Sequence, residues 1–195
     1  MGGKFICVEG LDGCGKTTQV KLLVRWLRSE GYEVLRTAEP TRGTLGRIIK
    51  RSLRRAGLRA RVEALLFAAD RLEHAESLII PSLREGKIVV SERCVYSSLA
   101  YQSARGLPME WIEGINVFAP LPDFAILIDV PPEMCVRRIR GRRKLDKFES
   151  DLELQRTVRM KYLELVRKGR LELVDGTGSV GDVHQQIRKL VEKIL

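Results

Sequence analysis

The stretch that decides the fold is Gly10-Leu11-Asp12-Gly13-Cys14-Gly15-Lys16-Thr17. It has the spacing glycine, any four residues, glycine, lysine and then serine or threonine, which forms a phosphate-binding loop between a strand and a helix. Before it, Phe5-Ile6-Cys7-Val8 is a short apolar run typical of a buried strand. After it, apolar residues recur at helical spacing until a glycine, at Val20, Leu23, Val24, Leu27 and Gly31. The flanks therefore supply the strand and the helix that this loop requires.

Such a loop binds a nucleoside triphosphate. Its glycines let backbone N–H groups close around phosphate oxygens, and the helix N-terminus adds a favourable dipole. Lys16 is expected to reach the β- and γ-phosphates, and the Thr17 hydroxyl to ligate Mg²⁺. The alternative is a glycine-rich turn with an incidental lysine. The residues expected to bind ATP are Gly10, Leu11, Asp12, Gly13, Cys14, Gly15, Lys16, Thr17 and Thr18.

The composition indicates a globular protein with anionic partners. At 195 residues, 44% hydrophobic, the chain is expected to form one domain, with no apolar run long enough to span a bilayer. Its net charge of +10 suits nucleotide phosphates or nucleic acid, and charge alone does not choose between them. The four cysteines form no Cys-x-x-Cys pair, so we expect a reducing cytoplasm and no metal cluster.

Strands alternate with helices along the whole chain. Strands are predicted at 5–8, 33–38, 87–90, 124–128 and 171–174. This order predicts a three-layer α/β fold, a five-stranded parallel sheet with helices on both faces. A long helix over 60–83 has its apolar stripe at Val62, Leu65, Leu66, Ala69 and Leu72, with a bend at Pro81. A further helix is predicted over 148–167, after a segment rich in arginine and lysine.

Three candidate site segments, 10–17, 39–44 and 92–101, each follow a predicted strand. Ligands of such sheets gather at the carboxyl ends of the strands, so the three segments are expected to converge. Arg42 and Arg93 lie in them, and arginine forks suit the phosphate of an acceptor nucleotide. The alternative for both is a solvated surface arginine.

Phe67 and Arg71 are four residues apart and share one helix face, away from the apolar stripe. A ring beside a guanidinium could stack a nucleobase and donate to its carbonyl. The residues alone also fit a core phenylalanine and a solvated arginine.

Together these stretches resemble the thymidylate kinase family of nucleoside monophosphate kinases, in the right order over nearly the whole chain. The matching stretches are Val8-Glu9-Gly10, Asp12-Gly13-Cys14-Gly15-Lys16-Thr17-Thr18-Gln19, Glu39-Pro40, Leu66-Phe67-Ala68-Ala69-Asp70-Arg71, Arg93, Ser97-Ser98-Leu99-Ala100-Tyr101-Gln102 and Leu145-Asp146-Lys147-Phe148-Glu149.

The resemblance implies individual roles. Phe67 is expected to stack on thymine and Arg71 to hydrogen-bond the base. Arg93 would bridge donor and acceptor phosphates, and Asp12 would meet the acceptor sugar or the Mg²⁺ shell. Tyr101 would pack against the sugar and disfavour a 2′-hydroxyl; its alternative is an ordinary half-buried helix tyrosine. The residues expected to bind dTMP are Asp12, Glu39, Arg42, Phe67, Arg71, Arg93, Ser98, Tyr101 and Gln102.

The basic segment at about 137–149 resembles the family's lid, which closes over the triphosphate. A solvated basic turn or a nucleic-acid patch also fits its charge. Position 14 is Cys rather than the arginine of some members, so the resemblance implies a catalytic arginine from the lid. Arg142 is the candidate, with Arg138 flanking the adenine.

The chain departs from the family after the third strand, where Glu92-Arg93-Cys94 replaces Asp-Arg-Tyr or Asp-Arg-His. Glu92 keeps a carboxylate for Mg²⁺, directly or through water. Glu-Arg here, with Glu39-Pro40, also resembles deoxynucleoside kinases, in which Glu39 could act as a base.

The sequence thus favours a thymidylate kinase that uses ATP, dTMP and Mg²⁺, with Lys16, Arg93, Asp12 and Arg142 as the catalytic residues. The family implies a homodimer. One alternative is a deoxynucleoside kinase. Another, from a different class, is a phosphate-loop ATPase that binds nucleic acid through its basic surface; we consider nucleic acid an improbable partner, and we expect no membrane association.

Overall fold

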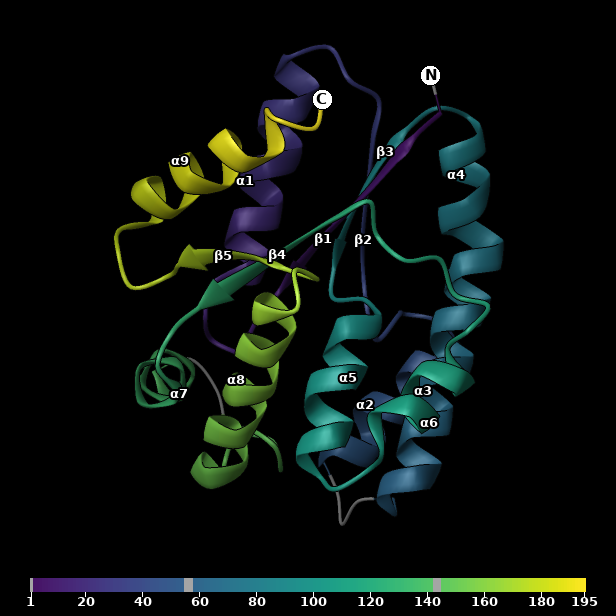
Figure 1. The fold of residues 1–195 in the computed structure, drawn as a ribbon, viewed down its shortest axis with the longest axis vertical. Helices are drawn as coiled ribbons and strands as arrows, with labels where there is room; N and C mark the ends of the chain where they lie inside the picture. Colours follow the sequence, from purple (N-terminus) through teal and green to yellow (C-terminus); the bar gives the residue numbers. More distant parts are fainter. Residues whose placement is uncertain (1, 55–57, 142–144) are drawn as a thin grey trace.

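The protein folds as a five-stranded parallel sheet surrounded by helices (Figure 1). The computed structural model describes residues 2–54, 58–141 and 145–195. The strands are β1 (Lys4–Glu9), β2 (Val34–Ala38), β3 (Ile88–Glu92), β4 (Phe124–Asp129) and β5 (Glu172–Asp175). The helices are α1 (Lys16–Ser29), α2 (Thr44–Arg54), α3 (Ala60–His74), the π-helical turn η1 (Ala75–Ile79), α4 (Ile80–Arg84), α5 (Val95–Ala104), α6 (Met109–Ile115), α7 (Pro132–Arg140), α8 (Leu152–Arg167) and α9 (Val180–Val191). The predicted fold class is confirmed.

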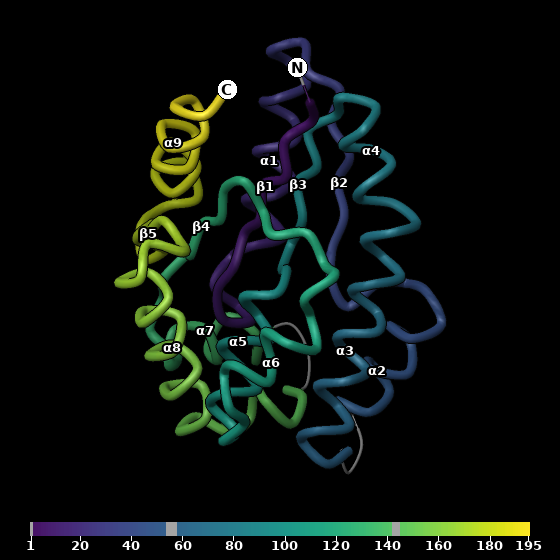
Figure 2. The backbone as a smooth tube through the Cα atoms, turned by 45° about the vertical axis from the view of Figure 1, so that its right-hand side comes forward, coloured from purple at the N-terminus to yellow at the C-terminus, as the bar shows by residue number. Residues whose placement is uncertain are grey.

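The strand order β2-β3-β1-β4-β5 sets the layers. Crossovers between parallel strands are right-handed, and the chain reverses direction across the sheet after β2. The α1 crossover therefore lies on one face and the later crossovers lie on the other. In agreement, α1 packs against α9, while α5 packs against α8 (Figures 1 and 2). The central strand β1 is buried from Phe5 to Glu9, because it has a neighbouring strand on each side and helices above and below.

The predicted helix over 60–83 is α3, η1 and α4 in succession. Pro81 has no amide hydrogen and would leave a carbonyl of a regular α-helix without its partner. The π-helical turn directly before it shifts the hydrogen-bond pattern, and the helical path continues to Arg84. The predicted helix over 148–167 begins later, at Leu152, because the Asp151 side chain accepts from the Leu154 N–H and caps it there.

The apolar stripe predicted for α3 does not lie in the core, and only Leu66 and Leu72 of its five residues are half-buried. Val62 and Leu65 are 46% and 50% exposed, and Ala69 is exposed as well. The buried face of α3 carries Ala64 and Ala68 with charged side chains between them, namely Glu63, Asp70 and Arg71. Periodicity finds an apolar face but does not tell what covers it.

No helix of the described residues is both long and apolar enough to traverse a bilayer.

One close approach fixes the second site segment. Gly46 of α2 lies so near the loop before it that a Cβ there would be 2.2 Å from the Thr41 carbonyl oxygen. The helix therefore rests directly on the backbone of Thr41, which follows Glu39 and Pro40 of the site described below.

We predict that Gly46→Ala lowers the free energy of unfolding by about 1–3 kcal/mol, because overpacking a tight contact costs about that much. Gly114→Ala in α6 is the matched control, since a Cβ there meets nothing within 4 Å. It should raise the free energy of unfolding by about 0.5–1 kcal/mol, the usual gain of alanine over glycine in a helix. Urea denaturation of both variants measures this; equal effects would contradict the contact.

Candidate functional site

The loop after β1 has the geometry of a phosphate cradle. Gly13 and Gly15 have φ angles of 88° and 107°, which L-residues with side chains rarely adopt. A Cβ on Gly13 would also lie 2.4 Å from the Cys135 carbonyl oxygen. Lys16 is buried at the start of α1, and its ammonium donates to the carbonyls of Gly10 and Leu11 at 3.0 and 2.9 Å.

A cavity of about 590 Å³ opens over this loop. Every predicted ATP-binding residue from Asp12 to Thr18 lines it, and so does Arg138 of α7. Gly10 and Leu11 contribute carbonyls to Lys16 instead. Arg138 donates to the carbonyls of Cys14 and Gly176 at 3.3 and 3.4 Å. The cavity has the size and the basic, N–H-rich wall that a nucleotide requires.

The predicted metal ligands lie together. The Thr17 hydroxyl, at the start of α1, donates to the Glu92 carboxylate at the end of β3, at 2.9 Å. Both are oxygen ligands of the kind that Mg²⁺ prefers, and both line the cavity.

Arg93 lies at the turn between β3 and α5, and its φ angle is 78°. Among the described residues it is the one with a positive φ that is not a glycine. Its N–H donates to the Val8 carbonyl, and its guanidinium donates to Asp12 at 2.7 Å and to Ser97 at 2.9 Å. Burial raises the pKa of Asp12, but the charges of Arg93 and Lys16 outweigh it and hold that pKa well below its usual range. Asp12 is therefore a carboxylate that joins two cations.

A second cavity, of about 240 Å³, shares Asp12 and Glu92 with the first and is also lined by Arg93. Phe67 lines it from α3, half-buried, so this ring faces a pocket rather than the core. Its lining residues are Asp12, Glu39, Pro40, Lys50, Leu53, Phe67, Glu92, Arg93, Ser97, Ser98, Tyr101, Gln102, Asp146, Phe148 and Glu149. The three predicted segments thus converge as expected.

Gln102 and Tyr101 are the polar side chains of this lining whose state bears most on a ligand. Gln102 is buried, and its Oε1 has no hydrogen-bond partner. Burial raises the pKa of Tyr101 to about 12, so its hydroxyl stays neutral at physiological pH. The Arg93 guanidinium lies 5.1 Å from the Tyr101 ring centroid, within cation–π range.

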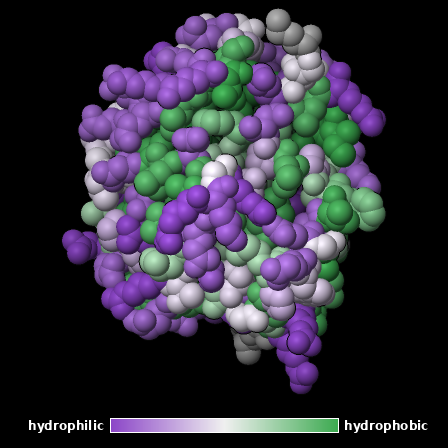
Figure 3. All heavy atoms as spheres, in the orientation of Figure 1, coloured by the Kyte–Doolittle hydropathy of each residue, from purple (hydrophilic) through white to green (hydrophobic). Residues whose placement is uncertain are grey.

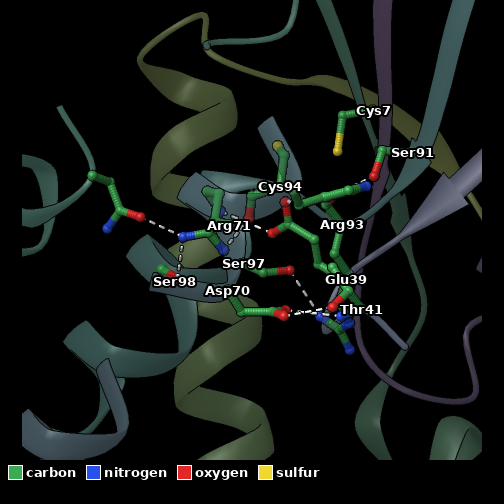
Figure 4. Close-up of polar contacts among 12 residues, drawn as sticks. Cys7, Glu39, Thr41, Asp70, Arg71, Ser91, Arg93, Cys94, Ser97 and Ser98 are labelled. Carbon is green, nitrogen blue, oxygen red and sulfur yellow. Dashed lines mark hydrogen bonds and ion pairs between the residues drawn. The ribbon is translucent and has the colours of Figure 1, made fainter. Parts of the chain in front are cut away.

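Arg71 is more enclosed than expected. Its guanidinium donates to Glu39 at 2.8 Å, to Ser98 and Asn116 at 3.0 and 2.5 Å, and to the Cys94 carbonyl at 3.1 Å (Figure 4). It does not line the cavity, whereas its partners Glu39 and Ser98 do. Arg42 is exposed and lines neither cavity.

A thymidylate kinase family model matches residues 8–187. The chain belongs to the thymidylate kinase family. Among its relatives, a protein of Pyrococcus abyssi named "Probable thymidylate kinase" is 46% identical over 199 residues, covering 98% of this chain and 97% of the relative. Proteins of the same name from Pyrococcus horikoshii and Pyrobaculum calidifontis are 47% and 42% identical, each covering 98% of this chain and 97% of the relative.

Several cavity residues were missed from the sequence. Lys50 of α2 lines the smaller cavity and donates to the Thr41 carbonyl at 2.8 Å. A basic face on a helix carries no signal that would separate Lys50 from its neighbours. Phe148 and Glu149 also line this cavity. Both belong to the stretch 145–149 that resembles the thymidylate kinase family, so the resemblance could have predicted them as site residues. Gln19 lines the larger cavity, in the stretch that continues the loop.

The basic segment is described in part. Arg137, Arg138 and Arg140 end α7, and Lys147 contacts Glu63 of α3. Arg142, the predicted catalytic arginine of this thymidylate kinase family member, lies outside the described residues. Asp70 belongs to the stretch 66–71 that resembles the family, but the sequence analysis gave it no role. It accepts from the N–H and the hydroxyl of Thr41 and so anchors the 39–41 loop (Figure 4).

One group among the described residues has metal-ligand spacing: Cys7, Glu9 and Cys94, whose ligand atoms lie within 4.8 Å of one another. Burial raises the pKa of both thiols, and Glu9 already accepts hydrogen bonds from protein donors. Protonated thiols and a saturated carboxylate do not favour a cation here.

Proposed function

We propose that this chain transfers the γ-phosphoryl group of ATP to dTMP, giving ADP and dTDP, in the presence of Mg²⁺. One observation supports the proposal above the others. The cavity over the phosphate loop and the cavity beside Phe67 share the side chains of Asp12 and Glu92. Two anionic substrates bound in them would meet at these shared residues, with Arg93 in the wall of the smaller cavity, which is the arrangement that phosphoryl transfer needs.

Thr17 and Glu92 would hold Mg²⁺, because their oxygens lie 2.9 Å apart at the cavity wall where the terminal phosphates would bind. When bound there, the ion neutralises charge on the phosphate oxygens. Lys16 and Arg93, which both contact Asp12 Oδ1, supply fixed positive charge to the transferred group. The lysine exchanges its bonds to loop carbonyls for bonds to phosphate oxygens.

The 195 residues form one kinase domain in this proposal, with 137–149 as its lid. Arg138 already lines the donor cavity, which suits contact with the adenine. Arg142 is the proposed lid arginine that meets the transferred group. Closing the lid excludes water, which strengthens these charge interactions and prevents hydrolysis of ATP.

The smaller cavity suits a thymine nucleotide. Phe67 presents a ring on which a base can stack, and such stacking contributes about 1–3 kcal/mol per base. The buried Oε1 of Gln102 can accept from the N3–H of thymine, whereas N3 of cytosine carries no hydrogen. Arg71 acts chiefly by orienting Ser98 and Glu39 around the base, and Tyr101 packs beside the sugar.

The deoxynucleoside kinase alternative needs a base for a sugar hydroxyl, and Glu39 fits that role poorly. Burial raises its pKa, but Arg71 and then His74 outweigh burial and lower it. Both of its carboxylate oxygens are held, one by Arg71 and one by His74. A paired carboxylate with a lowered pKa is a weak proton acceptor. An ATPase bound to nucleic acid would have no use for the cavity beside Phe67.

We predict that dTMP is phosphorylated with ATP and Mg²⁺, that thymidine is hardly used, and that dCMP is used with a kcat/KM lower by about 10²-fold or more. Chromatography of the products resolves dTDP from ADP. Lys16→Ala should fold normally and lose about 10²–10³-fold in kcat. Thymidine phosphorylated as fast as dTMP would contradict the proposed reaction.

We also propose that the chain forms a homodimer through the exposed stripe of α3. Val62 and Leu65 stand half in solvent on this helix, at helical spacing with Ala69. Further exposed apolar residues, Leu78, Val117, Phe118 and Leu121, lie on η1 and on the connection from α6 to β4. Hydrophobic side chains are visible on that side of the molecule in Figure 3. An apolar helix stripe on a second copy is its natural partner.

Leu65→Glu is expected to convert the dimer to a monomer, because the interface would bury an unpaired charge. Met160→Glu on α8 is the matched control, since Met160 is 49% exposed and Leu65 50%. Sedimentation velocity gives the mass of each. A monomeric parent chain, or a dimer in both variants, would exclude this interface.

The buried, unpaired cysteines lead us to propose a cytoplasmic location.

A further inference from the structure

Glu9 is the last residue of β1, next to the phosphate loop, and has no part in the function proposed above. Its side chain is fully buried. Its Oε1 accepts from the N–H groups of Cys94 and Ser97, at 2.8 and 3.1 Å. Its Oε2 accepts from the hydroxyls of Ser97 and Tyr162, at 2.6 and 2.7 Å. The Cys7 thiol of β1 also approaches Oε1, at 3.7 Å. The buried side chain of Glu9 thus takes its N–H and hydroxyl donors from α5, its N-cap and α8.

The first pair of bonds caps helix α5. Cys94 is the N-cap residue, and its own side chain provides no capping hydrogen bond. Glu9 reaches across from β1 and takes the place of that side chain, with its negative charge at the positive end of the helix. The turn that Glu9 fixes in this way begins directly after Arg93.

The second pair connects Glu9 to the Arg93 side chain. Arg93 donates to the Ser97 hydroxyl oxygen at 2.9 Å, and that hydroxyl donates to Glu9 Oε2. The Ser97 hydroxyl has one hydrogen, which goes to Glu9 Oε2, and it accepts from Arg93 through a lone pair; the Tyr162 hydroxyl, 3.1 Å away, is its other possible partner. Because a carboxylate can only accept, both hydroxyls direct their hydrogens toward Glu9. The direction of the whole chain of bonds depends on the carboxylate.

We propose that Glu9 is a positioning residue for phosphoryl transfer: it fixes the Arg93 guanidinium through Ser97 and through the N-terminus of α5. The inference rests on the proposed function of Arg93. The NH₂ group of an amide at this position would meet the Cys94 and Ser97 N–H donors in one orientation, and in the other it would force the Ser97 and Tyr162 hydroxyls to turn their hydrogens away. Glutamine has nearly the same shape as glutamate and therefore isolates the effect.

The experiment compares Glu9→Gln, Ser97→Ala and Tyr162→Phe in steady-state assays with ATP and dTMP. Glu9→Gln and Ser97→Ala should each lower kcat by about 10²-fold, the usual cost of a displaced catalytic group, while the KM for ATP changes little. Tyr162→Phe removes a hydrogen bond from the same carboxylate but leaves the path from Glu9 through Ser97 to Arg93, so its kcat should stay within about threefold of the parent value. Together, Glu9→Gln and Ser97→Ala should cost no more than either alone.

The outcomes separate a positioning role from a structural one. A merely structural Glu9 would make Tyr162→Phe and Glu9→Gln lose kcat in proportion to their loss of stability, which overturns the proposal. If Glu9→Gln does not fold, Ser97→Ala decides: parental kcat in that variant overturns it. Failure of the parent chain to phosphorylate dTMP would instead refute the proposed function, so the two failures are distinguishable.

Discussion

The ion pair between Asp12 and Arg93, at 2.7 Å, connects the phosphate loop to the turn after β3. The pair is partly buried, and Lys16 also contacts the same carboxylate oxygen, at 3.4 Å. Without Asp12, two cations would face each other in a site of low polarity, where their repulsion is strong. The carboxylate thus lets one small volume hold the two charges that a pair of phosphate groups requires. Asp12 lines both cavities, so this ion pair lies where they meet.

The sheet explains why these residues meet. β1 and β3 are neighbours in parallel register, with Val8 opposite Glu92, so the segments that follow them leave the same edge side by side. The third segment follows β2, the other neighbour of β3, where Ala38 lies opposite Glu92. Asp70 and Arg71 of α3 then hold that segment, through Thr41 and Glu39. Backbone topology brings the segments together, and buried ion pairs and hydrogen bonds set the side chains within them.

Sequence reasoning predicted the parts that depend on local pattern. The loop, its strand and its helix were recoverable because glycine positions and apolar periodicity are local properties. The environment of the α3 stripe could not be predicted from the sequence, because an apolar face has the same pattern whether a sheet or a second chain covers it. Arg71 was expected to meet the base directly, but four acceptors from distant segments enclose it. The role of Glu9 as a cap for α5 depends on residues more than eighty positions away, and no local pattern carries it.

If the proposed reaction is right, the two cavities form one site, with donor and acceptor phosphates meeting at Asp12 and Arg93. The most direct measurement is the binding of a compound in which adenosine and thymidine are joined through their 5′ positions by a chain of five phosphates. Calorimetry should give one molecule bound per chain, far more tightly than ATP or dTMP alone, and prior saturation with either nucleotide should weaken it. Binding that only one of the two nucleotides opposes, or that is no tighter than ATP, would contradict a continuous site.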